Sequence, residues 1–412
     1  MKNKFWAGFL SGLAGTILLI AIGFGVSSIL TIINDNSGQG KEFSASDNAD
    51  TDKVDDIVKK LERLDKVIDQ SYMEEVDEDA LVEGIYKGYV AGLGDPYSNY
   101  FTRQEYEDLM ESSSGVYFGI GASVSQDITT GIIKIVKPFL SSPAYEEGLL
   151  PEDVLYKVDG EEVTGKDLTE VVSKIKGPEG TTTDLIIIRE GESEELEFTV
   201  PRRKIEIPTI EYTMLDNQIG YISILEFDQI TVEQFRNAVE DLENQGQRGL
   251  IIDVRDNPGG LLDAVCNMLN RLLPEGLIVY TEDKYGNREE IKSDGKEVFD
   301  KPLVVLTNGN SASASEIFAG AIQDYEIGTI VGTTTFGKGI VQSIFPFPDK
   351  SAIKVTVSKY FTPKGRDIHE VGIVPDVEIE LNDELRRQVV IEKDEDNQLQ
   401  KGIEVLEDKI KG

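Results

Sequence analysis

Three short segments of small and polar residues hold the side chains of this chain that are best suited to chemistry. They are residues 255–260 (RDNPGG), 308–316 (NGNSASASE) and 335–339 (TFGKG), and each follows an apolar run that predicts a buried strand. In layered α/β proteins, ligand-binding and catalytic groups gather where strands end and helices begin. The three segments therefore form a candidate active site.

Ser313 is the candidate nucleophile. It stands at the start of a helix predicted over residues 313–324, where free N–H groups and the helix dipole favour a developing negative charge. The position also fits a purely structural role, because Ser313 and Glu316 have the spacing of a capping box. Ser311 and Ser315 offer equally plausible hydroxyls, so this segment alone leaves the nucleophile open.

Lys338 is the candidate general base. It lies between Gly337 and Gly339, which let the backbone bring the amine close to another group. An amine acts as a base near neutral pH only if its environment, such as burial, disfavours the charged form. In strand geometry Gln342 lies on the same face and could orient the amine. The alternative is an ordinary loop lysine.

The first segment offers backbone donors for a developing oxyanion. Gly259 and Gly260 follow Pro258 at the head of a predicted helix, so their N–H groups could act together with that of Ala314. The alternative is that the glycines only shape the turn into the helix.

The residue inventory excludes several other chemistries. The chain has one cysteine, Cys266, and one histidine, His369, which leaves no internal disulfide and no thiolate or imidazole set for zinc. We expect no metal and no cofactor. His369 lies in a polar stretch that predicts exposure, which argues against a Ser–His–Asp triad. The net charge of −35 makes nucleic acid an improbable partner.

The candidate site belongs to a region that alternates strands and helices, residues 202–380. This order predicts an α/β core with a mainly parallel sheet. Thr231 and Gln234 have capping-box spacing at the start of one of its helices. The expected strands cover residues 220–225, 249–254, 277–280, 303–307, 329–332 and 353–360, and the helices cover 231–244, 261–273 and 313–324.

Residues 100–201 predict a small barrel of strands with two helices. The strands are expected over residues 115–124, 132–136, 154–158, 184–189 and 196–200, and the helices over 143–148 and 168–175. Successive N–H groups of a Gly-flanked loop can capture a terminal carboxylate, while an open strand edge pairs with the peptide. The candidate peptide-binding residues are Tyr117, Phe118, Gly119, Ile120 and Gly121. The alternative is a loop in which the glycines only permit a tight start to a strand.

The N-terminal residues predict a membrane anchor. Lys2 and Lys4 precede an almost uncharged stretch, residues 5–33, which is long enough to cross a bilayer. We expect a single-pass anchor over residues 1–34 in the cell membrane, with the remainder outside the cytoplasm. A removed signal peptide is the alternative, and it would also export the protein. Residues 35–52 predict a linker, and residues 53–99 and 381–412 predict helical regions that could form a homodimer.

Taken together, these segments resemble the carboxyl-terminal processing (tail-specific) peptidase family. The resemblance rests on residues 255–260, 311–316 and 335–339 with Gln342, on Gly94-Asp95-Pro96, and on a PDZ-like region with residues 119–121, 142–144 and 158–160. Glu152 departs from the PDZ pattern, which has glycine there. The match covers roughly residues 55–380.

The resemblance implies a serine endopeptidase that cleaves proteins near their C-termini. Its active site would be a Ser–Lys dyad, with Ser313 as nucleophile, Lys338 as base and Gln342 as orienter. The fold would be a crotonase/Clp-protease-like core with an inserted-type PDZ domain, and the partners would be proteins or peptides with free C-termini. Two rival functions are a tethered PDZ adaptor with an inactive hydrolase core, and an acyl-transfer enzyme on the same core.

Overall fold

The computed structural model describes residues 48–388 and 391–411. The predicted anchor over residues 1–34 lies outside them. Among the described helices, none combines the length and the apolarity needed to cross a membrane. The chain divides into two compact units between Ile85 and Tyr86.

The helical region predicted over residues 53–99 contains two helices. They are α3 (Asn48–Ser71) and α4 (Glu78–Ala91), the second of which spans the division between the units. Several apolar side chains of α3 are exposed, among them Val54, Ile57 and Val67. The homodimer suggested by the terminal helices stays a prediction.

The PDZ-like domain, residues 116–206, is a small antiparallel barrel. Its main sheet has the order β3-β4-β5-β7-β8, β6 pairs with β5, and β2 pairs with β9. The apolar core includes Ile133, Leu155, Val158, Leu185 and Ile187. The elements are β2 (Val116–Gly119), β3 (Ala122–Gln126), β4 (Ile133–Pro138), α6 (Pro143–Glu146), β5 (Val154–Val158), β6 (Glu161–Glu162), α7 (Leu168–Ile175), β7 (Thr182–Ile188), β8 (Leu196–Pro201) and β9 (Arg203–Glu206).

A helix that the sequence did not predict, α5 (Arg103–Ser114), precedes this domain. Its residues carry no continuous apolar stripe, which is why periodicity did not reveal it. The sequence nevertheless contains a signal for the start of this helix. The Glu105 N–H donates to Thr102 Oγ1 at 3.3 Å, and the Thr102 N–H donates to Glu105 Oε2 at 2.8 Å, which is a capping box.

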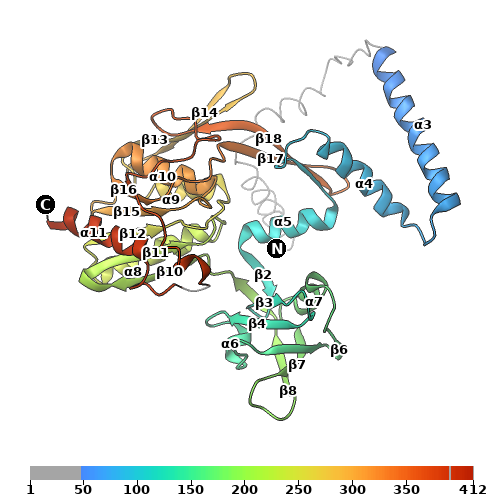
Figure 1. The fold of residues 1–412 in the computed structure, drawn as a ribbon, viewed down its shortest axis with the longest axis horizontal. Coiled ribbons are helices and arrows are strands. Elements are labelled where there is room, and N and C mark those ends of the chain that lie inside the picture. Colours follow the sequence, from blue (N-terminus) through green and yellow to red (C-terminus); the bar gives the residue numbers. More distant parts are fainter. Residues whose placement is uncertain (1–47, 389–390, 412) are drawn as a thin grey trace, which may run out of the picture. The chain divides into compact units, whose positions relative to one another are not determined.

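The core domain is a three-layer α/β/α structure, as its alternating pattern predicted (Figure 1). Its sheet has the order β10-β11-β12-β15-β16-β19, and every pairing from β11 to β19 is parallel. Helices α8, α9 and α10 cover one face and α11 covers the other. The elements are β10 (Ile210–Leu215), η1 (Asp216–Gln218), β11 (Ile219–Ile224), α8 (Thr231–Asn244), β12 (Gly249–Asp253), α9 (Leu262–Leu269), β15 (Leu303–Thr307), α10 (Ala314–Tyr325), β16 (Gly328–Gly332), β19 (Val377–Glu378), η2 (Leu385–Arg387) and α11 (Asn397–Lys411).

The apolar run of β12 shows how one strand serves both layers. Leu250 and Ile252 pack into the core cluster with α8–α10, whereas Ile251 packs with Leu399 and Leu406 of α11. Successive side chains of a strand point to opposite faces, so a strand covered on both faces is apolar throughout.

A second sheet joins distant parts of the chain. Its strands are β1 (Asn99–Phe101), β13 (Gly276–Asp283), β14 (Arg288–Ser293), β17 (Ile340–Pro346) and β18 (Ala352–Phe361), with β1 and β17 both paired to β18. Because β1 precedes the PDZ-like domain in the chain, that domain is an insertion between two parts of the core domain. The pairing also fixes the residues just before β1 against β18.

The capping box predicted at Thr231 and Gln234 is wrong. Thr231 is the first residue of α8, and its hydroxyl donates to the Glu226 carbonyl at 3.0 Å. Gln234 Oε1 instead accepts the Thr209 N–H at 2.9 Å. Both side chains tie the helix to neighbouring loops, because Thr231 lies inside the helix rather than at its cap.

Candidate active site

The structure brings the three polar segments together at one edge of the core sheet. They follow β12, β15 and β16, which are parallel neighbours, so their carboxyl ends meet. The Ala312 N–H donates to the Asn257 carbonyl at 3.0 Å, and the Phe336 N–H donates to the Ser311 carbonyl at 3.0 Å. The convergence predicted from the sequence is therefore confirmed.

The hydrogen bonds separate the three serines of the second segment. Ser311 and Ser315 are fully buried, and their hydroxyls donate to the carbonyls of Val254 at 2.7 Å and Asn257 at 2.9 Å. Ser313 is only half-buried. Two of the hydroxyls thus hold loops together, which leaves Ser313 as the serine best placed to react.

The backbone of Ser313 is strained. Its φ of 55° and ψ of −114° lie outside the usual regions for a residue with a Cβ atom. Such strain costs of order 1–3 kcal/mol and persists only where the surroundings impose it. Here Ser313 forms a sharp turn between the loop after β15 and the first residue of α10.

Glu316 connects the serine turn to the lysine loop. Its side chain is fully buried and accepts four hydrogen bonds. Oε2 accepts from the N–H groups of Ser313 at 2.9 Å and Lys338 at 2.8 Å, while Oε1 accepts from the Gly337 N–H at 2.7 Å and Thr335 Oγ1 at 2.6 Å. The half of the predicted capping box in which Glu316 accepts from Ser313 is confirmed. Its reach to the lysine loop was not predicted.

Tyr360 on β18 adds a second connection. Its hydroxyl lies against two carbonyl oxygens, 3.0 Å from that of Ser313 and also hydrogen-bonded to that of Lys338. Burial, followed by the charge of Glu316, raises the pKa of Tyr360 well above its usual range, so the hydroxyl stays a donor. No local motif marks this residue, because its role arises only from strand pairing.

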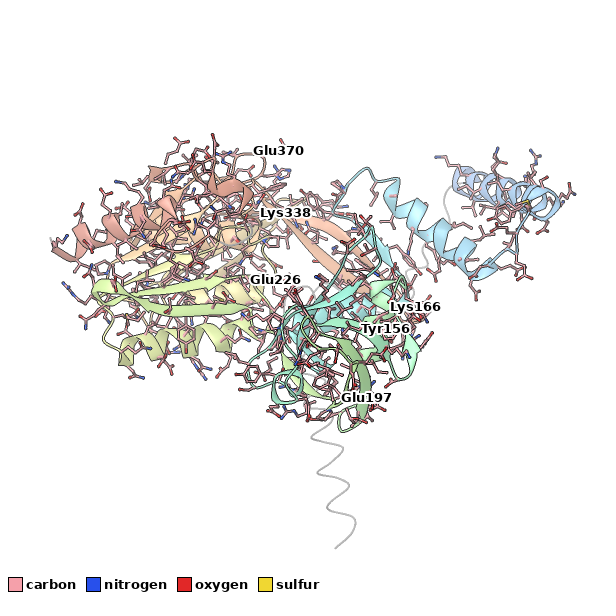
Figure 2. All side chains as sticks on the ribbon, turned by 60° about the horizontal axis from the view of Figure 1, so that its bottom comes forward. Tyr156, Lys166, Glu197, Glu226, Lys338 and Glu370 are labelled. Atoms are coloured by element: carbon pink, nitrogen blue, oxygen red, sulfur yellow. The ribbon has the colours of Figure 1, made fainter. Side chains whose placement is uncertain are left out.

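The environment of Lys338 favours the neutral amine. Burial and then the nearby charge of Lys354 lower its pKa, although Glu316 and Asp95 act in the opposite direction. Its Nζ lies 4.6 Å from the centre of the Tyr97 ring. Figure 2 marks Lys338 among the surrounding side chains. A lysine whose pKa is lowered in this way can accept a proton at lower pH than an exposed one.

A turn before β1 contributes to this environment. Asp95 accepts hydrogen bonds from Ser98 Oγ at 2.6 Å and Thr356 Oγ1 at 2.7 Å, and the Thr356 N–H donates to Ser98 Oγ at 3.1 Å. These bonds fix the turn on β18. The sequence marked residues 94–96 as part of a familiar pattern but gave no role for Asp95 or Tyr97.

The Gln342 side chain lies near the turn that contains Asp95 rather than against Lys338. Its Nε2 is 3.5 Å from both Thr356 Oγ1 and the Ile340 carbonyl. Among the hydrogen bonds of the described residues, none joins Gln342 to Lys338. The register of β17 and β18 shifts between Val341 and Gln342, which alters the strand geometry assumed for the prediction. Its role as orienter stays a prediction.

The glycine loop lies directly against the serine turn. A Cβ on Gly259 would lie 2.8 Å from Ser313 Cβ and 2.8 Å from the Ala312 carbonyl oxygen, and φ is +112°. The Gly259 N–H already donates to Asn257 Oδ1 at 2.8 Å. Within the described part of the chain, no partner is found for the N–H groups of Gly260 and Ala314.

The predicted exposure of His369 is wrong. The side chain is half-buried, and its Nδ1 is buried without a hydrogen-bond partner among the described residues. Its backbone packs against Gly339, where an added Cβ would lie 2.4 Å from the His369 nitrogen. Asp367 accepts the backbone N–H of His369 at 2.9 Å rather than a ring N–H. Among the described residues, no carboxylate accepts a hydrogen bond from the His369 ring, as a triad would require.

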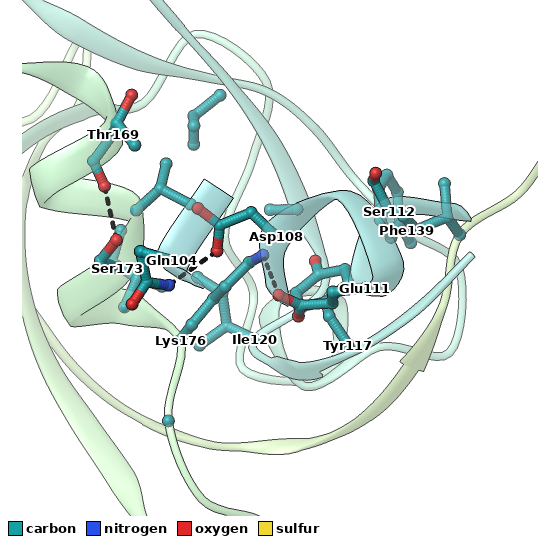
Figure 3. Close-up of a pocket in the computed structure, with 16 residues that line it drawn as sticks. Gln104, Asp108, Glu111, Ser112, Tyr117, Ile120, Phe139, Thr169, Ser173 and Lys176 are labelled. Carbon is teal, nitrogen blue, oxygen red and sulfur yellow. Dashed lines mark hydrogen bonds and ion pairs between the residues drawn. The ribbon is translucent and has the colours of Figure 1, made fainter. Parts of the chain in front are cut away.

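The predicted peptide-binding residues lie at the start of an open strand edge. Tyr117, Phe118 and Gly119 belong to β2, and Gly121 precedes β3, which among the described strands pairs with β4 alone and so lies at the edge of its sheet. Beside β3 lies a cavity of about 640 Å³ (Figure 3). Its lining includes Tyr117, Ile120 and Val124, together with residues of α7 and of α5.

Comparisons with known proteins match three parts of the chain to family models. Residues 218–379 match Peptidase family S41, residues 141–189 match a PDZ domain, and residues 20–105 match the Activating protease CtpB N-terminal domain. Carboxy-terminal processing protease CtpA of Bacillus subtilis is 37% identical over 89% of this chain and 77% of its own length. A carboxyl-terminal-processing protease of Synechocystis is 38% identical over 71% and 69%. A solved structure of the photosystem II D1 C-terminal processing protease is 30% identical, with a TM-score of 0.45 over 75% of this chain and 84% of that one.

Proposed function

Since this chain belongs to peptidase family S41 and is a carboxyl-terminal processing serine protease, we propose that it cleaves by a Ser–Lys dyad of Ser313 and Lys338. The observation that carries the proposal is that two buried side chains, Glu316 and Tyr360, each contact both of these residues. Glu316 Oε2 accepts both of their N–H groups, and the Tyr360 hydroxyl contacts both of their carbonyls. The two loops are thus held in one fixed relation, as a nucleophile and its base require.

The reaction would proceed in two halves. Neutral Lys338 accepts the proton of the Ser313 hydroxyl while Oγ forms a bond to the carbonyl carbon of the scissile peptide. The protonated amine then gives that proton to the leaving nitrogen, and the C–N bond breaks to leave an acyl-enzyme. Water, deprotonated by Lys338, attacks the ester, and Ser313 recovers its proton.

Two backbone groups are suited to stabilise the oxyanion. The N–H groups of Gly260 and Ala314 belong to the residues that follow Gly259 and Ser313, which lie against each other, and they have no partner among the described residues. Gly259 has a different role, because its N–H is already donated to Asn257. Its small size lets the glycine loop approach Ser313. Fixed N–H donors of this kind stabilise the tetrahedral intermediate more than the planar substrate.

Substrate capture is proposed for the PDZ-like domain. The open edge of β3 and the Gly-flanked loop before it are suited to bind the C-terminus of a protein. The N-terminal apolar residues would tether the enzyme to the cell membrane with the protease outside the cytoplasm. We also propose that the core is related to the crotonase/Clp-protease fold, which is supported by its parallel sheet between helical layers.

The dyad is tested with Ser313→Ala and Lys338→Met in the full-length protein. Each should lower the cleavage rate of an unfolded protein substrate by at least about 1,000-fold, since removing a member of a catalytic unit has effects of that size. Ser193→Ala, an exposed serine between β7 and β8, is the matched control. If either dyad variant cleaved at the rate of the control, the dyad would be wrong. Labelling of Ser313 by a serine-reactive probe would further exclude an inactive adaptor.

A further inference from the structure

An aromatic ring lies against the amine of the proposed base. Lys338 Nζ is 4.6 Å from the centre of the Tyr97 ring, which is within the range of a cation–π interaction. Among the described residues, no hydrogen bond or ion pair joins Nζ to another group. The ring of Tyr97 is therefore well placed to fix the position of the amine.

A turn anchored on β18 holds Tyr97 in place. Asp95 Oδ1 accepts the Tyr97 N–H at 3.0 Å, while Asp95 Oδ2 accepts from Ser98 Oγ at 2.6 Å and Thr356 Oγ1 at 2.7 Å. The Thr356 N–H donates in turn to Ser98 Oγ, and Ser98 is buried. Strand β1 follows at once and pairs with β18. The ring is thus presented by a turn that is fixed on the strand beside the site.

An aromatic face distinguishes the two protonation states of an amine. The negative face of the ring attracts an ammonium group and has little attraction for a neutral amine. In the proposed first step, Lys338 becomes an ammonium as it takes the proton of Ser313, so the attraction grows during the step. A carboxylate at the same distance would favour the ammonium so strongly that the base would be protonated before the step.

We propose that Tyr97 is a positioning residue of the dyad, whose ring face holds the Lys338 amine in place and stabilises the ammonium formed when Lys338 takes the proton. This role presupposes that Lys338 is the base, as proposed above. The proton moves from Ser313 Oγ to Lys338 Nζ, and Tyr97 neither gives nor takes one. A residue that precedes the inserted PDZ-like domain thereby completes the site of the core domain.

The test compares Tyr97→Leu with Tyr97→Phe in the full-length protein, with fluorescein-labelled casein as the unfolded substrate. Both are measured at the high-pH plateau of cleavage, where Lys338 is neutral before the step. Tyr97→Leu removes the ring face and should lower kcat about tenfold while KM changes by less than about twofold. Tyr97→Phe keeps the ring face and should retain at least about half of the wild-type kcat.

Tyr285→Leu is the matched control. The Tyr285 N–H donates to Asp283 Oδ1 at 2.8 Å, and the Tyr285 ring lies 5.0 Å from Lys284 Nζ. The same turn and the same kind of contact thus recur between β13 and β14, away from the dyad. Its removal should leave kcat and KM unchanged.

Fluorinated phenylalanines at position 97 separate attraction from packing. Fluorine withdraws charge from the ring face and barely changes its size, so kcat should fall with each added fluorine while the melting temperature stays constant. A constant kcat along this series, or a wild-type kcat in Tyr97→Leu, would overturn the role of Tyr97 and leave the dyad intact. Wild-type cleavage by Lys338→Met would overturn the dyad and the role of Tyr97 together.

Discussion

A carboxylate that takes no part in bond making holds the two residues of the proposed dyad in place. Glu316 is fully buried, and each of its oxygens accepts two hydrogen bonds from the serine turn or the lysine loop. Bonds to a charged acceptor are roughly twice as strong as neutral ones. The proposed dyad would therefore depend on the geometry of Glu316 as much as on the chemistry of Ser313 and Lys338.

Glu316→Gln should lower kcat by about 100-fold or more, because small displacements of reacting groups have effects of that size. The amide replaces one acceptor with a donor that faces two N–H groups. Kinetics and melting curves together provide the measurement. Glu326→Gln, an exposed glutamate at the other end of α10, is the control. A variant with full activity and only lower stability would show that Glu316 serves the fold alone.

The charge next to Lys338 should govern the pH dependence of cleavage. Lys354 helps to lower the pKa of Lys338, so Lys354→Met should raise that pKa. In the proposed mechanism the neutral amine is the active form, so the rising limb of kcat/KM against pH should move to higher pH. Lys409→Met, an exposed lysine on α11, should leave the profile unchanged. Movement of the limb to lower pH would contradict the assignment of Lys338 as the base.

At the scale of the elements, the glycine loop after β12 lies directly against the serine turn, and the absence of a side chain at Gly259 permits this close contact. Gly259→Ala should lower kcat/KM by about 100-fold, because the added Cβ would lie 2.8 Å from Ser313 Cβ at a φ of +112°. Gly309→Ala is the matched control in the neighbouring loop, since a Cβ there meets no atom within 4 Å. If the two variants behaved alike, the loop would have no specific role at the nucleophile.

The sequence predicted those elements whose residues carry their own signal. Apolar runs such as residues 249–253 and 303–307 indicated buried strands, and the polar segments after them located the candidate site. Helix α5 and strand β14 were missed because their residues are mainly polar and lack a clear period. Tyr360 and Asp95 were missed for another reason. Their roles arise from the pairing of β18 with strands far away in the sequence, which no local pattern reports.

Over the whole molecule, a buried ionic cluster joins the core sheet to the C-terminal region. Arg255 follows β12 and pairs with Asp253 at 2.6 Å and with Asp396, just before α11, at 2.7 Å. The Tyr221 hydroxyl donates to Asp253 Oδ2 at 2.8 Å. Residue 255 belongs to the same loop as Gly259 and Gly260, so the cluster links the packing of α11 to the position of the loop beside Ser313.

Arg255→Met should lower the free energy of unfolding by about 3–5 kcal/mol, because it leaves two buried carboxylates without their cation. Burial alone would raise the pKa of Asp396, but hydrogen bonds from Arg255 and its charge lower it below the usual value. In the wild type, the stabilisation that Asp396 gains from Arg255 is therefore fully present above the ordinary pKa of an aspartate. It is lost as the pH falls through the lowered pKa of Asp396. Without Arg255 the pKa of Asp396 rises, so the loss of stability in the variant should be larger at pH 8 than at pH 4.

Denaturant unfolding at both pH values measures this loss of stability, with the exposed Arg288→Met as control. A deficit independent of pH would show that Arg255 acts by packing rather than by charge.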